Sequence, residues 1–171
     1  MEKTILDYAG NVLERVTDCP ACDYINGEFS LPCGIAYRDD ICMVSQDWEL
    51  PVKGMFIVSP IRCVSYLEQL TDDERNCIFG IVNRVAVFLR NSKVAKEFNI
   101  LFSEKAREHF HIWILPRDGW LDLGIDPTKD IRQLKKYALD NMRTEENLKA
   151  IMEINEKLRD EAKNWKKEMA K

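Results

Sequence analysis

The sequence lacks long apolar runs, and this absence excludes two classes of protein. No uninterrupted stretch approaches the ~18 apolar residues that suggest a membrane-spanning helix. Residues 1–4 lead into mixed charged residues instead of the apolar core of a secretory signal peptide. We therefore expect no membrane association and a cytoplasmic location, in which the six cysteines stay reduced.

An excess of basic residues is also missing. The chain has 25 Lys and Arg against 29 Asp and Glu, with a formal net charge of -4 and a pI near 5.3. This balance argues against a protein that binds nucleic acid through a broad basic face. We expect no nucleic-acid partner, but the balance allows a small basic site for a nucleotide phosphate.

Internal repeats and low-complexity linkers are absent, and 171 residues fit one domain with an appended element. Apolar residues at helical spacing predict a short leading helix over residues 4–17. Strand patterns then occur in a hairpin over 35–45, which turns at Asp39 and Asp40, and over 55–58, 99–102 and 109–115.

A long helix is expected in the middle of the chain. Thr71 and Glu74 have the spacing of a helix capping box, and apolar residues follow one helix face as far as Leu89. Antiparallel strands combined with a long helix predict an α+β domain over residues 1–120.

After Gly119 the pattern becomes helical. Asp126 and Pro127 are a good helix start, and Thr144 can cap a second helix. The second helix carries a seam that resembles a short coiled coil with one polar interruption: Ile151, Asn155, Leu158, Ala162, Trp165 and Met169. A helix that packs back on its own domain explains the seam equally well. Residues 121–171 are interpreted as a C-terminal helical extension.

The chain has only two histidines, His109 and His111, and they lie two residues apart. Alternate side chains of a β-strand share a face. His109, His111 and Trp113 would therefore point one way, while the apolar residues between them point into the core. This strand would display two imidazoles from a rigid support. A sheet face with two incidental polar residues produces the same pattern.

The stretch from His109 to Arg117 resembles the signature of the histidine-triad (HIT) superfamily. That signature is His-φ-His-φ-His-φ-φ, where φ is apolar, often followed by Pro-Arg. Three upstream motifs match the family in the same order: Cys19-Pro20-Ala21-Cys22, Tyr37-Arg38-Asp39-Asp40, and Val52-Lys53-Gly54 before a strand that ends at Pro60. The resemblance covers residues 19–117. It implies an antiparallel β-sheet with a long helix packed on it.

Known members of this superfamily cleave or transfer nucleotides at an α-phosphate through a nucleotidyl-histidine. The resemblance implies that His111 is the nucleophile and that Asp47 holds the ribose hydroxyls. Trp48 follows Asp47 and would line the base pocket.

The chain departs from the family pattern at two places. Trp113 replaces the third histidine and removes a donor near the leaving oxygen, although its side chain would still face the nucleotide. The family's loop of glycine and serine before the strand is shorter here and has no glycine. Within it, Ser103, Lys105 and Arg107 are the expected phosphate contacts.

Cys19 and Cys22 form a Cys-x-x-Cys motif. This is a common zinc half-site because two thiolates on a tight turn can meet one ion. A redox pair would need a βαβ context, which the pattern lacks. In the metal-binding branches of the resembled family, the remaining ligands stand at the positions of Cys63 and His109. The resemblance implies a closed Cys3His zinc site, which is structural.

The leading hypothesis is a nucleotide hydrolase or nucleotidyl transferase for dinucleoside polyphosphates or nucleoside phosphoramidates. Two alternatives stay open. One is a nucleotide-binding module with little or no catalysis, motivated by Trp113 and the altered loop. The other is an assembly module whose C-terminal helices pair chains or dock a partner. A homodimer fits the resemblance because members of the family are often dimers.

Overall fold

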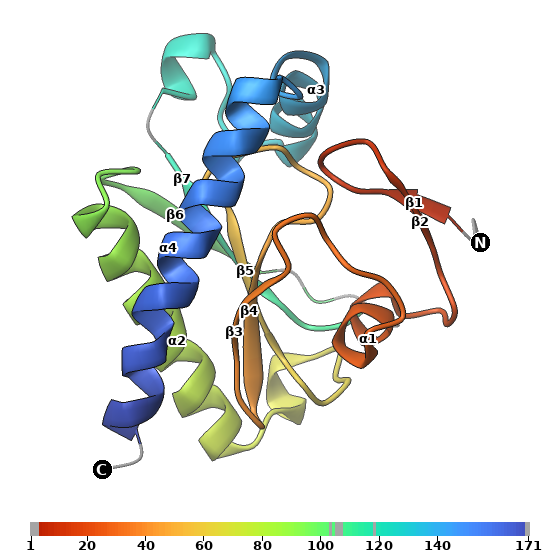
Figure 1. The fold of residues 1–171 in the computed structure, drawn as a ribbon, viewed down its shortest axis with the longest axis vertical. Helices are drawn as coiled ribbons and strands as arrows, with labels where there is room; N and C mark the ends of the chain where they lie inside the picture. The colour runs from red at the N-terminus through yellow and green to blue at the C-terminus, as the bar shows by residue number, and fades with distance from the viewer. Residues whose placement is uncertain (1–3, 103, 105–107, 118, 170–171) are drawn as a thin grey trace.

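The computed structural model describes residues 4–102, 104, 108–117 and 119–169. A five-stranded antiparallel sheet lies at its centre, in the order β3-β4-β5-β7-β6 (Figure 1). The strands are β3 (Ile35–Arg38), β4 (Cys42–Gln46), β5 (Phe56–Pro60), β6 (Phe98–Leu101) and β7 (Ile112–Pro116). The helices are α1 (Pro20–Asn26), α2 (Asp72–Asn91), α3 (Ile131–Asn141) and α4 (Glu145–Met169), with short 3₁₀ turns η1 (Leu67–Gln69) and η2 (Leu121–Leu123). The predicted α+β fold is confirmed.

The predicted leading helix is wrong, because the segment forms an antiparallel hairpin of β1 (Thr4–Leu6) and β2 (Val12–Glu14). Asp7 Oδ1 accepts the backbone N–H groups of Ala9 and Asn11 at 2.9 and 2.8 Å, and this local bonding closes the turn. Three of the apolar residues in this segment are exposed rather than packed: Leu6, Val12 and Val16.

The hairpin of β3 and β4 and the start of α2 form as predicted. Asp39 Oδ1 accepts the N–H groups of Ile41 and Cys42, which fixes the turn between the strands. At α2, Thr71 Oγ1 accepts the Glu74 N–H, and the Glu74 carboxylate accepts the Thr71 N–H in return. These two bonds satisfy helix-end donors that would otherwise lack partners.

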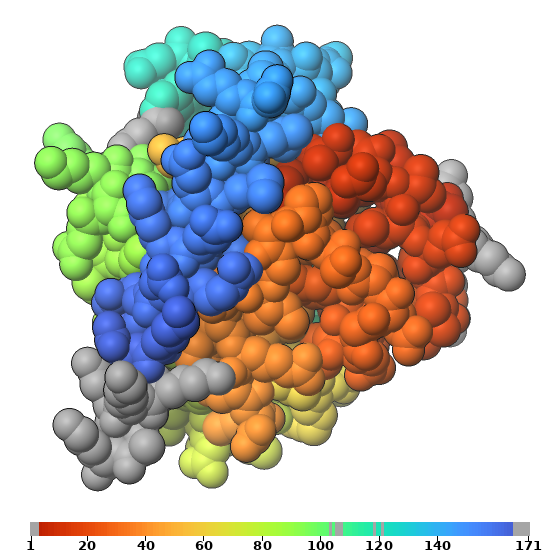
Figure 2. All heavy atoms as spheres, viewed as in Figure 1, coloured from red at the N-terminus to blue at the C-terminus, as the bar shows by residue number. Residues whose placement is uncertain are grey.

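Helices α2 and α4 cover the same face of the sheet, and Figure 2 shows α4 lying along the surface beside α2 and the β3–β4 hairpin. One apolar cluster joins the sheet, α2 and α4: Val44, Phe56, Val58, Ile78, Ile81, Val85, Leu89, Ile112, Ile114, Ile154, Leu158, Ala162 and Trp165. Fully burying a side chain such as Leu158 contributes ~2 kcal/mol, so α4 is part of the main core.

The buried seam of α4 decides between the two interpretations of this helix. Asn155 is fully buried, and its Nδ2 donates to the Cys33 carbonyl at 2.8 Å. The apolar residues of the seam are buried in the same cluster as the sheet and α2, so α4 packs back on its own domain. The side chain of Met169 lies outside the described part. The division between 1–120 and 121–171 stays a prediction about independent folding.

Two elements begin at least three residues later than predicted. The first C-terminal helix begins at Ile131 instead of Asp126, because Asp130 caps it by accepting the Arg132 N–H. Strand β7 begins at Ile112 instead of His109. Residues 109–111 contact the loop after β5, where the Phe110 N–H donates to the Val64 carbonyl at 2.7 Å.

None of the helices in the described part of the chain combines the length and apolar character needed to span a membrane.

Candidate functional site

The Cys-x-x-Cys motif forms the start of α1. Cys19 is the N-cap residue, Pro20 occupies the first turn, and Cys19 Sγ accepts the Cys22 N–H at 3.4 Å. Proline is suited to this position because its missing N–H would have no helical partner. The sequence thus places both sulfurs at the same end of one short helix.

Cys63 and His109 complete a group of four. Cys63 follows β5, and its Sγ lies 3.9 Å from Cys19 Sγ. His109 Nδ1 lies 3.7 Å from Cys19 Sγ and 3.6 Å from Cys22 Sγ. All four ligand atoms lie within 4.8 Å of one another, so the structure brings the four predicted ligands together as a group that could hold a metal ion.

The distances match the edges of a tetrahedral zinc site. With Zn–S bonds of about 2.3 Å and Zn–N bonds of about 2.0 Å, neighbouring sulfurs lie about 3.8 Å apart, and sulfur and nitrogen about 3.5 Å apart. His109 also has the required tautomer: Nε2 lies 2.9 Å from the Pro60 carbonyl, which can only accept, so Nε2 carries the proton. The Nδ1 lone pair therefore faces the sulfurs, as a ligand's must.

Electrostatics within this cluster also fit a cation. Burial and the neighbouring thiols of Cys19 and Cys63 raise the pKa of Cys22. Three thiolates this close repel one another unless a positive charge lies between them.

His111 lies beside the cluster, just before β7. Its Nδ1 lies 2.8 Å from the His109 carbonyl. Because a carbonyl can only accept, Nδ1 carries the proton, and in the neutral ring the lone pair is on Nε2. The ring meets Trp113 edge to face, with centroids 4.4 Å apart and an interplanar angle of 85°. Both side chains are half-buried, while Ile112 and Ile114 are fully buried, so the predicted alternation holds over residues 111–114; His109 is itself buried and precedes the strand.

Trp113 is held by Asp47. Its indole N–H donates to Asp47 Oδ2 at 3.0 Å, while Oδ1 accepts the N–H groups of Glu49 and Leu50. Asp47 is only 4% exposed. Burial raises the pKa of Asp47 to about 6, although its hydrogen bonds act in the opposite direction.

Of the other predicted nucleotide contacts, the structure describes Trp48. Trp48 packs against Phe29, with ring centroids 6.3 Å apart, in an apolar cluster with α1 and β2. Ser103, Lys105 and Arg107 lie outside the described residues.

Two features of the site had no signal in the sequence. The Pro60 carbonyl orients His109, but a backbone acceptor leaves no trace in a side-chain pattern. The bond between Asp47 and Trp113 joins residues 66 positions apart and depends on tertiary register.

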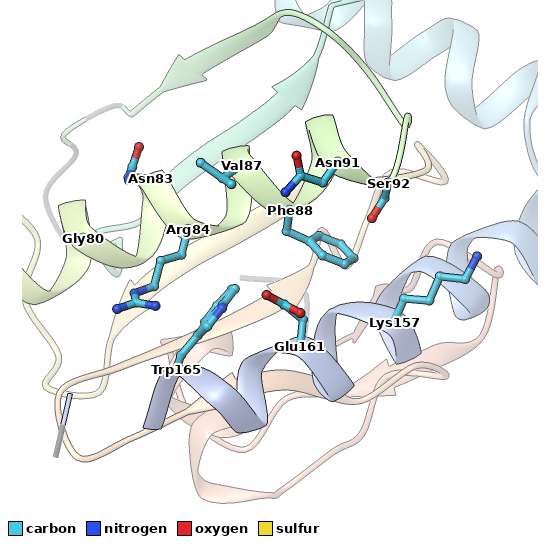
Figure 3. Close-up of a pocket in the computed structure, with 10 residues that line it drawn as sticks. All are labelled: Gly80, Asn83, Arg84, Val87, Phe88, Asn91, Ser92, Lys157, Glu161 and Trp165. Atoms are coloured by element: carbon cyan, nitrogen blue, oxygen red, sulfur yellow. The ribbon is translucent and has the colours of Figure 1, made fainter. Parts of the chain in front are cut away.

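A groove of about 620 Å³ lies between α2 and α4, where the Arg84 guanidinium carbon stands 6.0 Å from the Trp165 ring centroid (Figure 3). This groove is on the helix-covered face of the sheet, whereas Trp113 and His111 point to the other face.

No protein-family model matches the chain, and no curated protein matches it in sequence. Solved structures do match. A HIT family protein from Bacillus subtilis is 21% identical with a TM-score of 0.54, and the match covers 73% of this chain and 97% of that one. A Zn-bound histidine triad family protein from Mycobacterium smegmatis is 20% identical with a TM-score of 0.54, and the match covers 72% of this chain and 94% of that one. A hypothetical histidine triad nucleotide-binding protein from Sulfolobus tokodaii is 18% identical with a TM-score of 0.53, and the match covers 81% of this chain and 92% of that one. The chain therefore has the fold of the histidine-triad proteins.

Proposed function

We propose that the chain is a nucleotide hydrolase or nucleotidyl transferase that uses His111 as its nucleophile. Its substrates would be dinucleoside polyphosphates or nucleoside phosphoramidates. The observation that carries this proposal is the hydrogen bond from His111 Nδ1 to the His109 carbonyl. On a histidine-triad fold, this bond leaves the lone pair on Nε2, the nitrogen that would attack phosphorus.

The proposed reaction has two steps. Nε2 attacks the α-phosphorus, an N–P bond forms, and the bond to the leaving phosphate or amine breaks while the leaving group takes a proton from solvent. Water or another acceptor then attacks the same phosphorus and releases Nε2. The His109 carbonyl stabilises the positive charge that develops on the ring, because it accepts the hydrogen bond from Nδ1–H throughout.

Zinc is the metal that we propose for Cys19, Cys22, Cys63 and His109. Three thiolates and one imidazole give a closed tetrahedral set, so the ion would be structural and would supply no open position for substrate. It would instead fix His109, whose carbonyl orients the nucleophile.

The nucleotide contacts remain part of this proposal. Both Asp47 oxygens accept bonds from the chain itself, so a ribose hydroxyl would share Oδ2 with the indole N–H of Trp113. Trp48 as a base contact, and Ser103, Lys105 and Arg107 as phosphate contacts, stay predictions.

The test is a turnover assay on a panel of adenine and guanine dinucleotides and phosphoramidates, with wild type and His111→Ala in parallel. Wild type should release mononucleotide and His111→Ala should not. Quenching in alkaline denaturant, where an imidazole N–P bond survives, should reveal a nucleotidyl adduct on the peptide that contains His111. Equal zinc content and equal thermal stability in both proteins serve as the control. Turnover that persists in His111→Ala would overturn the proposed nucleophile.

A nucleotide-binding protein without turnover is the second candidate. The indole N–H of Trp113, its only polar donor, is engaged by Asp47 and cannot also protonate or bind a leaving group. Nucleotide binding by calorimetry, combined with no product from folded, zinc-loaded wild type, would favour this candidate.

We also propose that two copies pair through β6. This strand is at the edge of the sheet, and its Ile100 is 49% exposed. An exposed edge offers unpaired backbone groups to a second strand. A cytoplasmic location and the absence of a nucleic-acid partner stay predictions.

A further inference from the structure

A second pair of cysteines is in contact away from the histidines. Cys42 begins β4 and is fully buried, while Cys77 lies in the second turn of α2 and is half-buried. Their sulfurs lie 3.7 Å apart, and both side chains belong to the core between the sheet and α2. The pair is thus on the helix-covered face of the sheet, and the proposed reaction at His111 makes no use of it.

We propose that Cys42 and Cys77 form an oxidisable dithiol, which a hydroperoxide converts into a disulfide between β4 and α2. A disulfide needs its sulfurs about 2.05 Å apart, so the two atoms must approach by about 1.6 Å. The remaining cysteines have other partners. Cys33 Sγ contacts the Tyr8 hydroxyl at 2.8 Å, and Cys19, Cys22 and Cys63 form the metal cluster.

Asp39 lies beside the pair and could suggest a metal site instead. Its Oδ2 lies 3.7 Å from Cys77 Sγ, and the three ligand atoms lie close together. The carboxylate is already engaged, however. Oδ1 accepts two backbone N–H groups, and Oδ2 accepts the Tyr37 hydroxyl at 2.6 Å. A disulfide needs neither carboxylate oxygen, so its formation would leave these three bonds intact.

The charge environment also favours two neutral sulfurs. Burial, and then the Asp39 carboxylate, raise the pKa of both Cys42 and Cys77. Both thiols therefore stay largely protonated at neutral pH. A disulfide carries no charge and suits the apolar core around Cys42.

The proposed oxidation has two steps and consumes one hydroperoxide. The half-buried Cys77 loses its proton, for which Asp39 is the nearest acceptor, and its sulfur attacks the hydroperoxide to give a sulfenic acid and an alcohol or water. The Cys42 sulfur then attacks the Cys77 sulfur and expels water. Two thiols and one hydroperoxide become one disulfide, one water and one alcohol or a second water. Because both thiols stay largely protonated, we expect a slow response to sustained oxidant rather than rapid turnover.

Peptide mapping of the full-length protein after hydrogen peroxide treatment tests the proposal. Free thiols are alkylated in denaturant, and trypsin then releases residues 39–53 and 76–84, each of which contains one cysteine. We expect these two peptides to be linked, lighter than their sum by two hydrogen atoms, and separated by a reductant. Cys77→Ser should abolish the link, whereas Cys33→Ser, which changes a buried thiol elsewhere, should leave it intact.

Thermal unfolding provides a second readout. The loop between Cys42 and Cys77 is 35 residues long, and closing such a loop should raise the Tm by roughly 5–10 °C. Peroxide also reaches the metal cluster, so the comparison is oxidised wild type against equally oxidised Cys77→Ser. Should Cys77→Ser fail to fold, Cys77→Ala replaces it without placing a hydroxyl in the core.

Two outcomes would overturn the proposal. One is full alkylation of both cysteines under conditions that already oxidise Cys63. The other is uptake of a second equivalent of Zn²⁺ that Cys77→Ser loses, which would make the pair a metal site with Asp39.

Discussion

At the scale of single residues, backbone carbonyls assign different roles to the two histidines. The Pro60 carbonyl accepts a hydrogen bond from Nε2–H of His109, which leaves Nδ1 facing the sulfurs of the cluster. The His109 carbonyl accepts a hydrogen bond from Nδ1–H of His111, which leaves the lone pair on Nε2. His109 takes part in both hydrogen bonds, so whatever holds His109 in place also orients His111. The proposed structural metal therefore affects the proposed chemistry without touching substrate.

Asp47 should make the stability of the protein depend on pH. Burial raises its folded-state pKa to about 6, from an ordinary value of 3.8. The folded state therefore holds this proton more tightly than the unfolded state, and its contribution to stability is lost as pH rises between these values. A shift of this size corresponds to about 3 kcal/mol.

Urea unfolding of wild type and Asp47→Asn between pH 3.5 and pH 7 measures this effect. The substitution adds a constant offset, because an amide cannot reproduce every bond of the carboxylate. The free energy of unfolding of wild type minus that of Asp47→Asn should fall by about 3 kcal/mol as the pH rises from 3.5 to 7. Because other titrating groups are common to both proteins, a constant difference would show that Asp47 ionises normally.

At the scale of elements, α1 depends on the cluster that it helps to form. The helix has only seven residues, and a helix this short is marginal without tertiary support. Its N-cap is Cys19, and Asp23 in its first turn accepts the N–H groups of Val16 and Thr17 at 3.0 Å. A bound ion would link this helix to the loop after β5 and to the segment before β7.

Metal analysis should find about one zinc per chain, and the double variant Cys63→Ala, His109→Ala should lose it. A chelator should lower the Tm of wild type and leave that of the double variant unchanged. Cys33→Ser should keep its zinc, because Cys33 contacts Tyr8 and lies outside the cluster. Zinc well below one per chain in wild type, or full retention in the double variant, would reject the site.

Helix α4 should behave as part of the main core. Leu158 is fully buried among residues of the sheet and α2, so Leu158→Ala should destabilise the whole chain by about 2–5 kcal/mol. Met152→Ala, on the same helix but 41% exposed, should change stability by about 0.5 kcal/mol or less. Denaturant unfolding followed at two probes measures both. Loss of α4 alone, with the sheet still folded, would contradict the prediction.

The elements show which parts of the fold the sequence could predict. Signals that are local succeed: the capping box of Thr71 and Glu74 and the turn at Asp39 each depend on a few neighbouring residues. The helix predicted for residues 4–17 is wrong, because the Asp7 side chain accepts the N–H groups of Ala9 and Asn11 and closes a turn there despite the helical spacing of the apolar residues. The grouping of Cys19, Cys22, Cys63 and His109 was predicted from the resemblance to a known family. The bond from Trp113 to Asp47 was not, because it needs the register of β7 against β5.

At the scale of the whole molecule, the sheet is protected unevenly. Helices α2 and α4 cover one face, and β3 at one edge contacts α4. The opposite edge, β6, ends the sheet with Ile100 at 49% and the neighbouring Phe102 at 45% exposure. Proteins usually shield such an edge with charge or cover it with another element. A second copy of the chain would provide that cover.

Ile100→Lys tests this arrangement, since a charged residue on an edge strand opposes strand pairing. Wild type should sediment as a dimer, and Ile100→Lys should shift toward monomer as concentration falls, with an unchanged Tm of the monomer. Leu123→Lys places the same charge at a residue that is 51% exposed in η2, and it should leave the dimer intact. If wild type stays monomeric at every concentration, or if both variants dissociate alike, β6 is not the interface. A dimer that survives Ile100→Lys but not Leu123→Lys would move the contact to the C-terminal extension and support the assembly-module interpretation of residues 121–171.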